Sequence, residues 1–298
     1  MYHNSFQNRQ FTRKRSYQGN GRGFQNGRGR VKQRIHTSSY INKAEATPVE
    51  STIPIKNSFD DFQIDLRLRQ NISSHGYLVP TPIQDQAIPY ILAGRDLIGI
   101  ANTGTGKTGA FLIPLINKII LNNYERILII IPTRELAVQI NDELKVFSKS
   151  LNISSVLVIG GISIYRQISE LRRNPHIIIS TPGRLKDIIN RKLLNLYNFK
   201  NIVLDEVDRM VDIGFINDIK FIISKLPSVR QSLFFSATIP SEVNSIIQSF
   251  LKNPVTISVK VKEVANGIDQ DVIHTRDKKE KFEKLQSMLK QDEFKKVR

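Results

Sequence analysis

The sequence predicts an α/β fold in which helices cover both faces of a mostly parallel sheet. From residue 96 onward, short apolar runs alternate with longer segments whose apolar residues recur every three to four positions. The runs are DLIGIA from 96, RILIII from 126, VLVIG from 156, HIIIS from 176, NIVLDE from 201, QSLFFSA from 231 and TISVKV from 256. Continuous apolar runs of this length are typical of strands that are buried on both faces of a sheet.

The segments between these runs have the spacing of amphipathic helices. RELAVQINDELKVFSK at 134–149 and SEVNSIIQSFL at 241–251 each place apolar residues on one helical face. The stretch at 278–298 is highly charged and also carries a helical apolar stripe. We expect this last stretch to be a connector or the first helix of a further unit.

Composition excludes several classes of protein. With 298 residues, of which 40% are apolar, the chain can form one large domain with appendages. It has no cysteine, which excludes disulfides and thiolate metal sites, and its five histidines lack the spacing of a zinc site. The apolar run at 111–121 is interrupted by Pro114, Asn117 and Lys118, so we expect no membrane span. The N-terminus lacks the apolar segment of a secretory signal, which makes the cytoplasm the expected compartment.

The net charge of +17 indicates a polyanionic partner, with nucleic acid as the leading class. Residues 1–50 hold ten Lys and Arg against two acidic residues, and their arginines alternate with glycine and aromatic residues such as Phe24. We expect residues 1–55 to be a disordered tail that binds RNA through phosphate pairing and base stacking. A merely solubilising tail is the alternative.

A phosphate-binding loop is predicted at ANTGTGKT, 101–108, between the apolar run from 96 and a helical segment. Glycines there let backbone N–H groups approach phosphates, the lysine adds a positive charge, and the last threonine can bind Mg²⁺. The strict pattern has glycine where this chain has Ala101, a small change. The residues expected around the nucleotide phosphates are Thr103, Gly104, Thr105, Gly106, Lys107 and Thr108.

The acidic pair in LDEVD at 204–208 follows the apolar run from 201, where open α/β sheets bind their ligands. We expect Asp205 to hold Mg²⁺ and Glu206 to orient and deprotonate the attacking water, with Lys107 completing the catalytic set. A solvated turn is the alternative for such a pair.

The base of the nucleotide is predicted to be adenine. Gln84, in GYLVPTPIQ at 76–84, has an amide that can pair with the N6 and N7 edge of adenine. The NKxD sequence that usually reads guanine is missing after Asn42-Lys43 and Asn117-Lys118. Taken alone, Gln84 could be a surface polar residue.

Seven motifs occur in one order along the chain: GYLVPTPIQ, ANTGTGKT, PTRELA, GG, TPGR, LDEVDRM and SAT. This series resembles the N-terminal RecA-like domain of DEAD-box RNA helicases, and the LDEVDRMVDIGF string resembles bacterial members of the RhlE-like kind. The resemblance covers about 58–260. It implies a P-loop domain at 56–262, and a linker with the start of a second RecA-like domain at 263–298.

The resemblance also implies roles for residues that their chemistry alone does not single out. Phe59, seventeen residues before Gly76, would stack on the adenine, while Ser236 and Thr238 of SAT would couple the ATP state to strand separation. The residues implied at the RNA are Arg134, Gly160, Gly161, Thr181 and Arg184. Backbone contacts of this kind carry no sequence code, so we expect nonspecific and salt-sensitive RNA binding.

The implied function is ATP-dependent RNA helicase activity, with ATP and Mg²⁺ as cofactors. The chain departs from the family at Val207, where alanine is usual, and it reaches Arg298 without an HRxGRxxR-type motif. We therefore expect the second RecA-like domain to be missing and hydrolysis by this chain to be slow. Two rivals remain: a DNA-directed motor of the same superfamily, and a non-catalytic RNA-binding module that acts through the basic tail.

Overall fold

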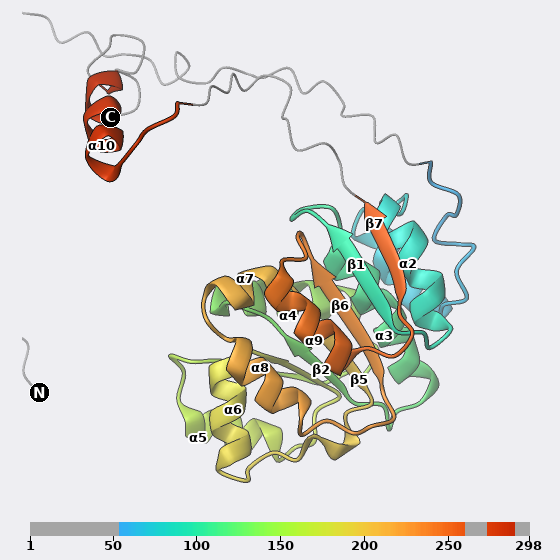
Figure 1. The fold of residues 1–298 in the computed structure, drawn as a ribbon. Coiled ribbons are helices and arrows are strands. Elements are labelled where there is room, and N and C mark those ends of the chain that lie inside the picture. Colours follow the sequence, from blue (N-terminus) through green and yellow to red (C-terminus); the bar gives the residue numbers. More distant parts are fainter. Residues whose placement is uncertain (1–53, 260–272, 290–298) are drawn as a thin grey trace, which may run out of the picture. The chain divides into compact units, whose positions relative to one another are not determined.

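The computed structural model describes residues 54–259 and 273–289, and its centre is one seven-stranded sheet (Figure 1). All strand pairs are parallel, and the strand order is β3-β4-β2-β5-β6-β1-β7. The strands are Leu97–Ala101 (β1), Ile127–Ile130 (β2), Ser155–Val158 (β3), Ile177–Ser180 (β4), Asn201–Leu204 (β5), Gln231–Ser236 (β6) and Val255–Val259 (β7). Each of the seven apolar runs overlaps one of these strands, with β3 and β7 beginning one residue before their runs, which confirms the predicted α/β fold.

Helices cover both faces of this sheet. One face packs against Leu66–Ser74 (α1), Pro82–Leu92 (α2), Lys107–Leu121 (α3) and Arg134–Phe147 (α4). The other packs against Ile164–Leu171 (α5), Pro182–Asn190 (α6), Val207–Asp212 (α7), Ile216–Ile223 (α8) and Ser241–Phe250 (α9). The period of two in a strand explains this division, because Ile127 and Ile129 belong to the first core and Leu128 and Ile130 to the second.

The central strands approach one another closely at Gly99 of β1. A Cβ added there would lie 2.5 Å from the ring of Phe235, which pairs with Gly99 across β1 and β6. Only glycine leaves room for that ring, so the sequence of β1 is adapted to the large aromatic side chains of β6.

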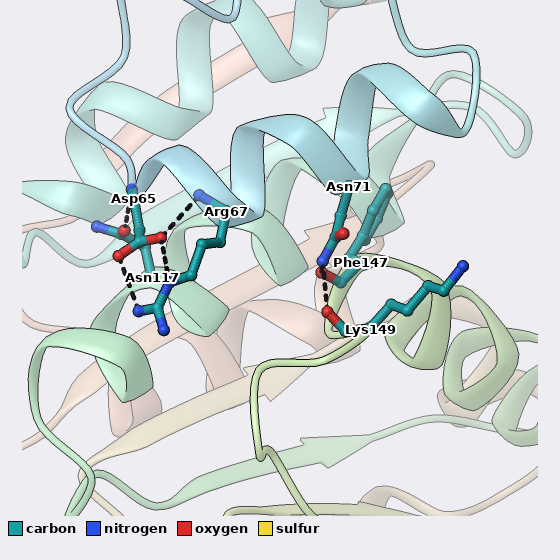
Figure 2. A network of polar contacts seen from close by, with 6 residues as sticks. All are labelled: Asp65, Arg67, Asn71, Asn117, Phe147 and Lys149. Atoms are coloured by element: carbon teal, nitrogen blue, oxygen red, sulfur yellow. Dashed lines mark hydrogen bonds and ion pairs between the residues drawn. The ribbon is translucent and has the colours of Figure 1, made fainter.

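Polar contacts hold α1 against the helices beneath it (Figure 2). The buried Asn117 of α3 accepts a hydrogen bond from the backbone N–H of Asp65 at 2.8 Å. At the other end of α1, the Asn71 amide donates to the carbonyls of Phe147 and Lys149, at 2.8 and 2.9 Å, where α4 ends. These contacts fix the segment that carries Phe59 and the GYLVPTPIQ motif against the body of the domain.

The charged C-terminal stretch contains a helix, Lys278–Met288 (α10), and none of its residues is buried. This agrees with the helical periodicity noted there. The expected tail at 1–55 lies almost entirely outside the described residues, as do 260–272 and 290–298. Within the described ranges, no helix has the length and apolar character needed to cross a bilayer.

Candidate functional site

The predicted site residues lie mainly at one edge of the sheet. Because all strands are parallel, their carboxyl ends share that edge, and each of β1 to β6 is followed there by one predicted motif. The phosphate loop follows β1, PTRELA follows β2, GG follows β3, TPGR follows β4, the acidic pair follows β5, and SAT includes the end of β6.

The phosphate loop runs from β1 to the first residue of α3. Gly104 and Gly106 have φ angles of 82° and 93°, which side chains other than glycine rarely adopt. Lys107 begins α3, is buried, and donates from Nζ to the backbone carbonyl of Ala101 at 2.9 Å. Because Ala101 contributes only its carbonyl to this contact, alanine in place of the usual glycine leaves the loop intact.

Gln84 lies beside this loop rather than on the surface. Its side chain is fully buried, with Oε1 accepting from the Thr81 N–H at 3.0 Å and Nε2 donating to the Gly106 carbonyl at 3.0 Å. Added Cβ atoms at Gly106 and Gly109 would each lie 2.7 Å from Nε2. The amide therefore braces the phosphate loop, and its pairing with adenine stays a prediction.

Phe59 is also largely buried. It packs edge to face on Phe62, with ring centroids 6.0 Å apart, and borders a hollow of about 330 Å³ together with Arg69 and the exposed Leu78. This places the ring within the first core, next to the GYLVPTPIQ segment. Its stacking on adenine is not tested by this arrangement and stays a prediction.

The acidic pair occupies a tight turn between β5 and α7. Asp205 is buried and accepts a hydrogen bond from the backbone N–H of Glu206 at 2.9 Å. Burial raises the pKa of Asp205 to about 6, although the charge of Lys107 acts in the opposite direction. Glu206 has φ 52° and ψ 49°, an uncommon left-handed conformation for glutamate, and its carboxylate pairs with Arg209 at 3.2 Å. Such strain is a feature of functional sites.

Asp208 is a residue that sequence reasoning missed. Its Oδ2 accepts three hydrogen bonds, from the N–H groups of Ala237 and Thr238 and from the Thr238 hydroxyl, at 2.9 to 3.1 Å. Its own N–H donates to the Ser236 hydroxyl at 3.2 Å. Asp208 thus joins the acidic turn directly to SAT. The second aspartate in LDEVD, three residues after Asp205, was the available signal.

The residues implied at the RNA surround a second hollow of about 510 Å³, which Arg134, Gly160, Thr181 and Arg184 all line. The guanidinium of Arg134 lies over the glycine turn, because a Cβ added at Gly161 would be 2.3 Å from its Nη1. Arg184 donates from Nη1 to the Ile162 carbonyl at 3.2 Å. The structure therefore brings these residues together, with Gly161 directly beside the hollow.

Strand order divides the edge into two halves. The strands β3, β4 and β2 carry the residues around the Arg134 hollow, whereas β6 and β1 carry SAT and the phosphate loop. The acidic turn follows β5, which lies between the two halves and pairs with both β2 and β6.

A model of the DEAD/DEAH box helicase family matches residues 81–246, more than half of the chain. The chain belongs to this family. Similar curated proteins include the ATP-dependent RNA helicase CshA of Listeria monocytogenes, 42% identical over 232 residues, and the DEAD-box ATP-dependent RNA helicase CshA of Bacillus licheniformis, 43% identical over 234 residues. Each alignment covers 78% of this chain, and 45% and 48% of the two relatives.

Two solved structures are also similar to this chain. A DEAD box protein from Methanococcus jannaschii is 35% identical with a TM-score of 0.66, and the match covers 78% of this chain and 63% of that one. A hypothetical ATP-dependent RNA helicase from Sulfolobus tokodaii is 32% identical with a TM-score of 0.62, covering 65% and 57%. These matches confirm the RecA-like fold.

The DEAD-box chain described here spans about half the length of the curated relatives that it matches. Its closer placement among RhlE-like proteins stays a prediction, because the relatives named above are CshA proteins. Val207, where the family usually has alanine, is fully buried in the second core beneath the acidic turn. The helix α7 therefore accommodates the larger side chain within that core.

Proposed function

We propose that this chain is a motor domain of an ATP-dependent RNA helicase, which binds ATP with Mg²⁺ on one half of the sheet edge and RNA on the other. The observation that supports this proposal is that hydrogen bonds connect the acidic turn after β5 to both halves of the sheet edge. Asp208, three residues after the buried Asp205, binds the SAT segment, and the Asp205 N–H donates to the carbonyl of Ile130, the last residue of β2. A ligand that moved the acidic turn would therefore act on both halves.

The nucleotide half is suited to a triphosphate. The phosphate loop leads into the N-terminus of α3, whose first N–H groups and positive dipole end attract anions. Lys107 adds a charge that is held at the base of the loop by the Ala101 carbonyl. We expect Thr103, Gly104, Thr105 and Gly106 to surround the phosphates through their backbone N–H groups.

The donors near this loop also fit Mg²⁺. No group of three or more potential ligand residues occurs in the described part of the chain, which suits an ion held by one or two protein ligands and by phosphate oxygens. We propose that the Thr108 hydroxyl and the Asp205 carboxylate are these ligands. Burial raises the pKa of Asp205 to about 6 despite the charge of Lys107, so a cation bound beside the carboxylate would favour its ionised form. The ion would neutralise charge on the β- and γ-phosphates.

We propose that Glu206 acts on the attacking water. In this role its carboxylate accepts a proton from the water while the water oxygen bonds to the γ-phosphorus, and the bond to the bridging oxygen breaks. Arg209 lies 3.2 Å from one carboxylate oxygen and leaves the other available for the water. The left-handed backbone at Glu206 turns α7 away directly after this residue.

The RNA half is suited to a phosphate backbone. Arg134 and Arg184 supply charge, the turn at Gly160 and Gly161 permits close approach, and Thr181 precedes the N-terminus of α6. None of these groups reads a base edge. The proposal therefore includes nonspecific single-stranded or short duplex RNA as the partner, with strong salt dependence.

Two matched pairs of variants test this function in the full chain. Lys107→Ala should abolish binding of a fluorescent ATP analogue but spare RNA binding. The control is Lys225→Ala, since Lys225 is exposed at the amino edge of the sheet, and this variant should bind both ligands like the parent chain. Arg134→Ala should weaken RNA binding and lower the dependence of log affinity on log salt by about 0.7, the value for one single-strand phosphate. Its control is the exposed Arg95→Ala. ATP binding that survives Lys107→Ala would reject the nucleotide site.

The same measurements separate the rival functions. Equal affinity for single-stranded DNA and RNA of one length, with equal stimulation of any ATPase activity, would favour a DNA-directed motor. An Arg134→Ala variant with unchanged RNA affinity, combined with complete loss on deletion of residues 1–50, would favour binding through the basic tail alone.

A further inference from the structure

The segment 162–192, which contains α5 and α6 and part of the rim of the Arg134 hollow, is basic and carries an exposed aromatic side chain. Residues 162–192 contain seven Lys and Arg against two acidic residues, a net charge of +5. Tyr165, near the start of α5, is 81% exposed. Neither the motif series nor the hollow includes this tyrosine.

Residues near Tyr165 contact the rim of the hollow. Arg184, which lines the hollow, donates to the carbonyl of Ile162, three residues before Tyr165. Asp187 also lines the hollow and pairs with Arg191 at 2.7 Å. The hydrogen bond and charge of Asp187 raise the pKa of Arg191, and Tyr165 adds a smaller effect in the same direction, so the phenol lies within electrostatic reach of that guanidinium.

Exposure alone does not distinguish Tyr165. Tyr124 is 87% exposed, but it lies between α3 and β2 at the opposite, amino edge of the sheet. Tyr165 instead follows Ile162, which Arg184 contacts, by three residues, so its Cα lies within about 11 Å of the Ile162 Cα. That distance is about three stacked nucleotides at ~3.4 Å each.

We propose that Tyr165 is a base-stacking residue that extends the RNA site beyond the Arg134 hollow, with Arg184 and Arg191 holding phosphates on either side. This inference rests on the proposed RNA function and adds a contact to it. Exposed aromatic rings among basic groups bind single strands by stacking, because every base presents a π face. An acidic protein would use the charge of this surface but would not require an aromatic ring at this point.

The test uses the full chain and oligouridylate RNAs of 4 to 12 nucleotides, each with one 2-aminopurine at a varied position. In the parent chain, one position near an end of the longer RNAs should be quenched by stacking. Tyr165→Ala should remove that quenching and weaken binding of the 12-mer about 10-fold. Binding of the 4-mer should change less than 2-fold, because it is too short to occupy both the hollow and Tyr165.

Two further variants control for other effects. Tyr165→Trp should keep both the quenching and the affinity, and Tyr124→Ala should behave as the parent chain. The basic tail is the same in every variant, so it contributes equally to each affinity. Tyr165 is exposed, so thermal unfolding should be unchanged in all of them.

Three outcomes would overturn the inference in distinguishable ways. If Tyr165→Ala binds the 12-mer within 2-fold of the parent while Arg134→Ala weakens it, the RNA site stands and the stacking residue is rejected. If Tyr165→Ala and Tyr124→Ala weaken binding equally, the effect is not local to this surface. If the parent itself does not bind RNA, the inference fails together with the proposed function.

Discussion

Replacing Asp205 with asparagine should stabilise the nucleotide-free chain while abolishing its response to Mg²⁺ and ATP. Burial raises the pKa of this carboxyl from 3.8 to about 6, against the attraction of Lys107. At neutral pH the folded chain therefore carries an ionised group in an environment that disfavours ionisation. Asparagine has nearly the same shape and can still accept the hydrogen bond from the Glu206 N–H.

The size of the effect follows from the pKa shift. A rise of about two units corresponds to about 3 kcal/mol of unfavourable free energy when the carboxyl is ionised. This figure already includes the attraction of Lys107, so we expect Asp205→Asn to stabilise the chain by up to about 3 kcal/mol. For a domain of this size each kcal/mol raises the melting temperature by about 2 to 4 °C.

The direction in which the stability contribution of Asp205 changes with pH also follows from the pKa shift. Between the unfolded pKa of 3.8 and the folded value of about 6, the folded state binds the proton more tightly. The Asp205 contribution to stability therefore falls as pH rises through this window and stays at its lowest above it. Asp205→Asn should remove this dependence, so its advantage over the parent should be largest near pH 7 to 8 and vanish near pH 4.

Thermal unfolding from pH 4 to 8, with and without Mg²⁺ and ATP, measures both parts of this prediction. Asp208→Asn is the control from the same turn. Burial tends to raise the pKa of Asp208, but hydrogen bonds from Thr238, Arg209 and Ser236 outweigh it and lower the pKa below 3.8. This variant should be destabilised at pH 7. A melting temperature of Asp205→Asn at or below that of the parent at pH 7.5 would refute the argument.

Two further predictions concern residues around the phosphate loop. Glu206→Gln should keep ATP and RNA affinity within about 2-fold but abolish any RNA-stimulated phosphate release, and release at the parent rate would exclude Glu206 as the group that activates water. Gly109→Ala should favour the helix α3 by about 0.8 to 1 kcal/mol, since alanine is the better helix former. Its Cβ would nonetheless meet the Gln84 amide at 2.7 Å, so ATP binding and the preference for ATP over GTP should both weaken in competition assays. An unchanged preference would mean that Gln84 does not read the base.

Much of the fold could be predicted because the sheet is buried on both faces. Such strands have to be apolar at every position, so the runs from 126 and 176 stand out from the helices around them. The edge strand β7 was also found, although only half of it is buried, because Ile257 and Val259 alternate with exposed residues. Local periodicity is therefore sufficient to predict both the buried central strands and the edge strand.

Contacts between distant segments could not be predicted in the same way. Asn71 and Asn117 fasten α1 to α4 and α3 across 76 and 52 positions of sequence, and nothing in the surrounding pattern indicates their partners. The buried environment of Gln84 could likewise not be predicted from the sequence. Two prolines before it suggested a surface turn, but the amide is fully buried against the phosphate loop. Burial of a single polar side chain depends on tertiary packing, which periodicity does not record.

The position of β5 explains why the acidic turn can serve both halves of the edge. Its neighbours are β2, which leads to Arg134, and β6, which ends in SAT. The left-handed backbone of Glu206 costs of order 1 to 3 kcal/mol, and the hydrogen bonds of Asp205 and Asp208 on either side hold it in place. A group that attracts the Asp205 carboxylate toward the phosphate loop acts on this strained turn. The turn is connected to Thr238 directly through the Asp208 carboxylate and indirectly through the Ser236 hydroxyl, which accepts from the Asp208 N–H and donates to the Thr238 carbonyl. Asp208→Asn should therefore reduce the coupling between ATP and RNA affinity more than it reduces either affinity alone, and an unchanged coupling would place the connection elsewhere.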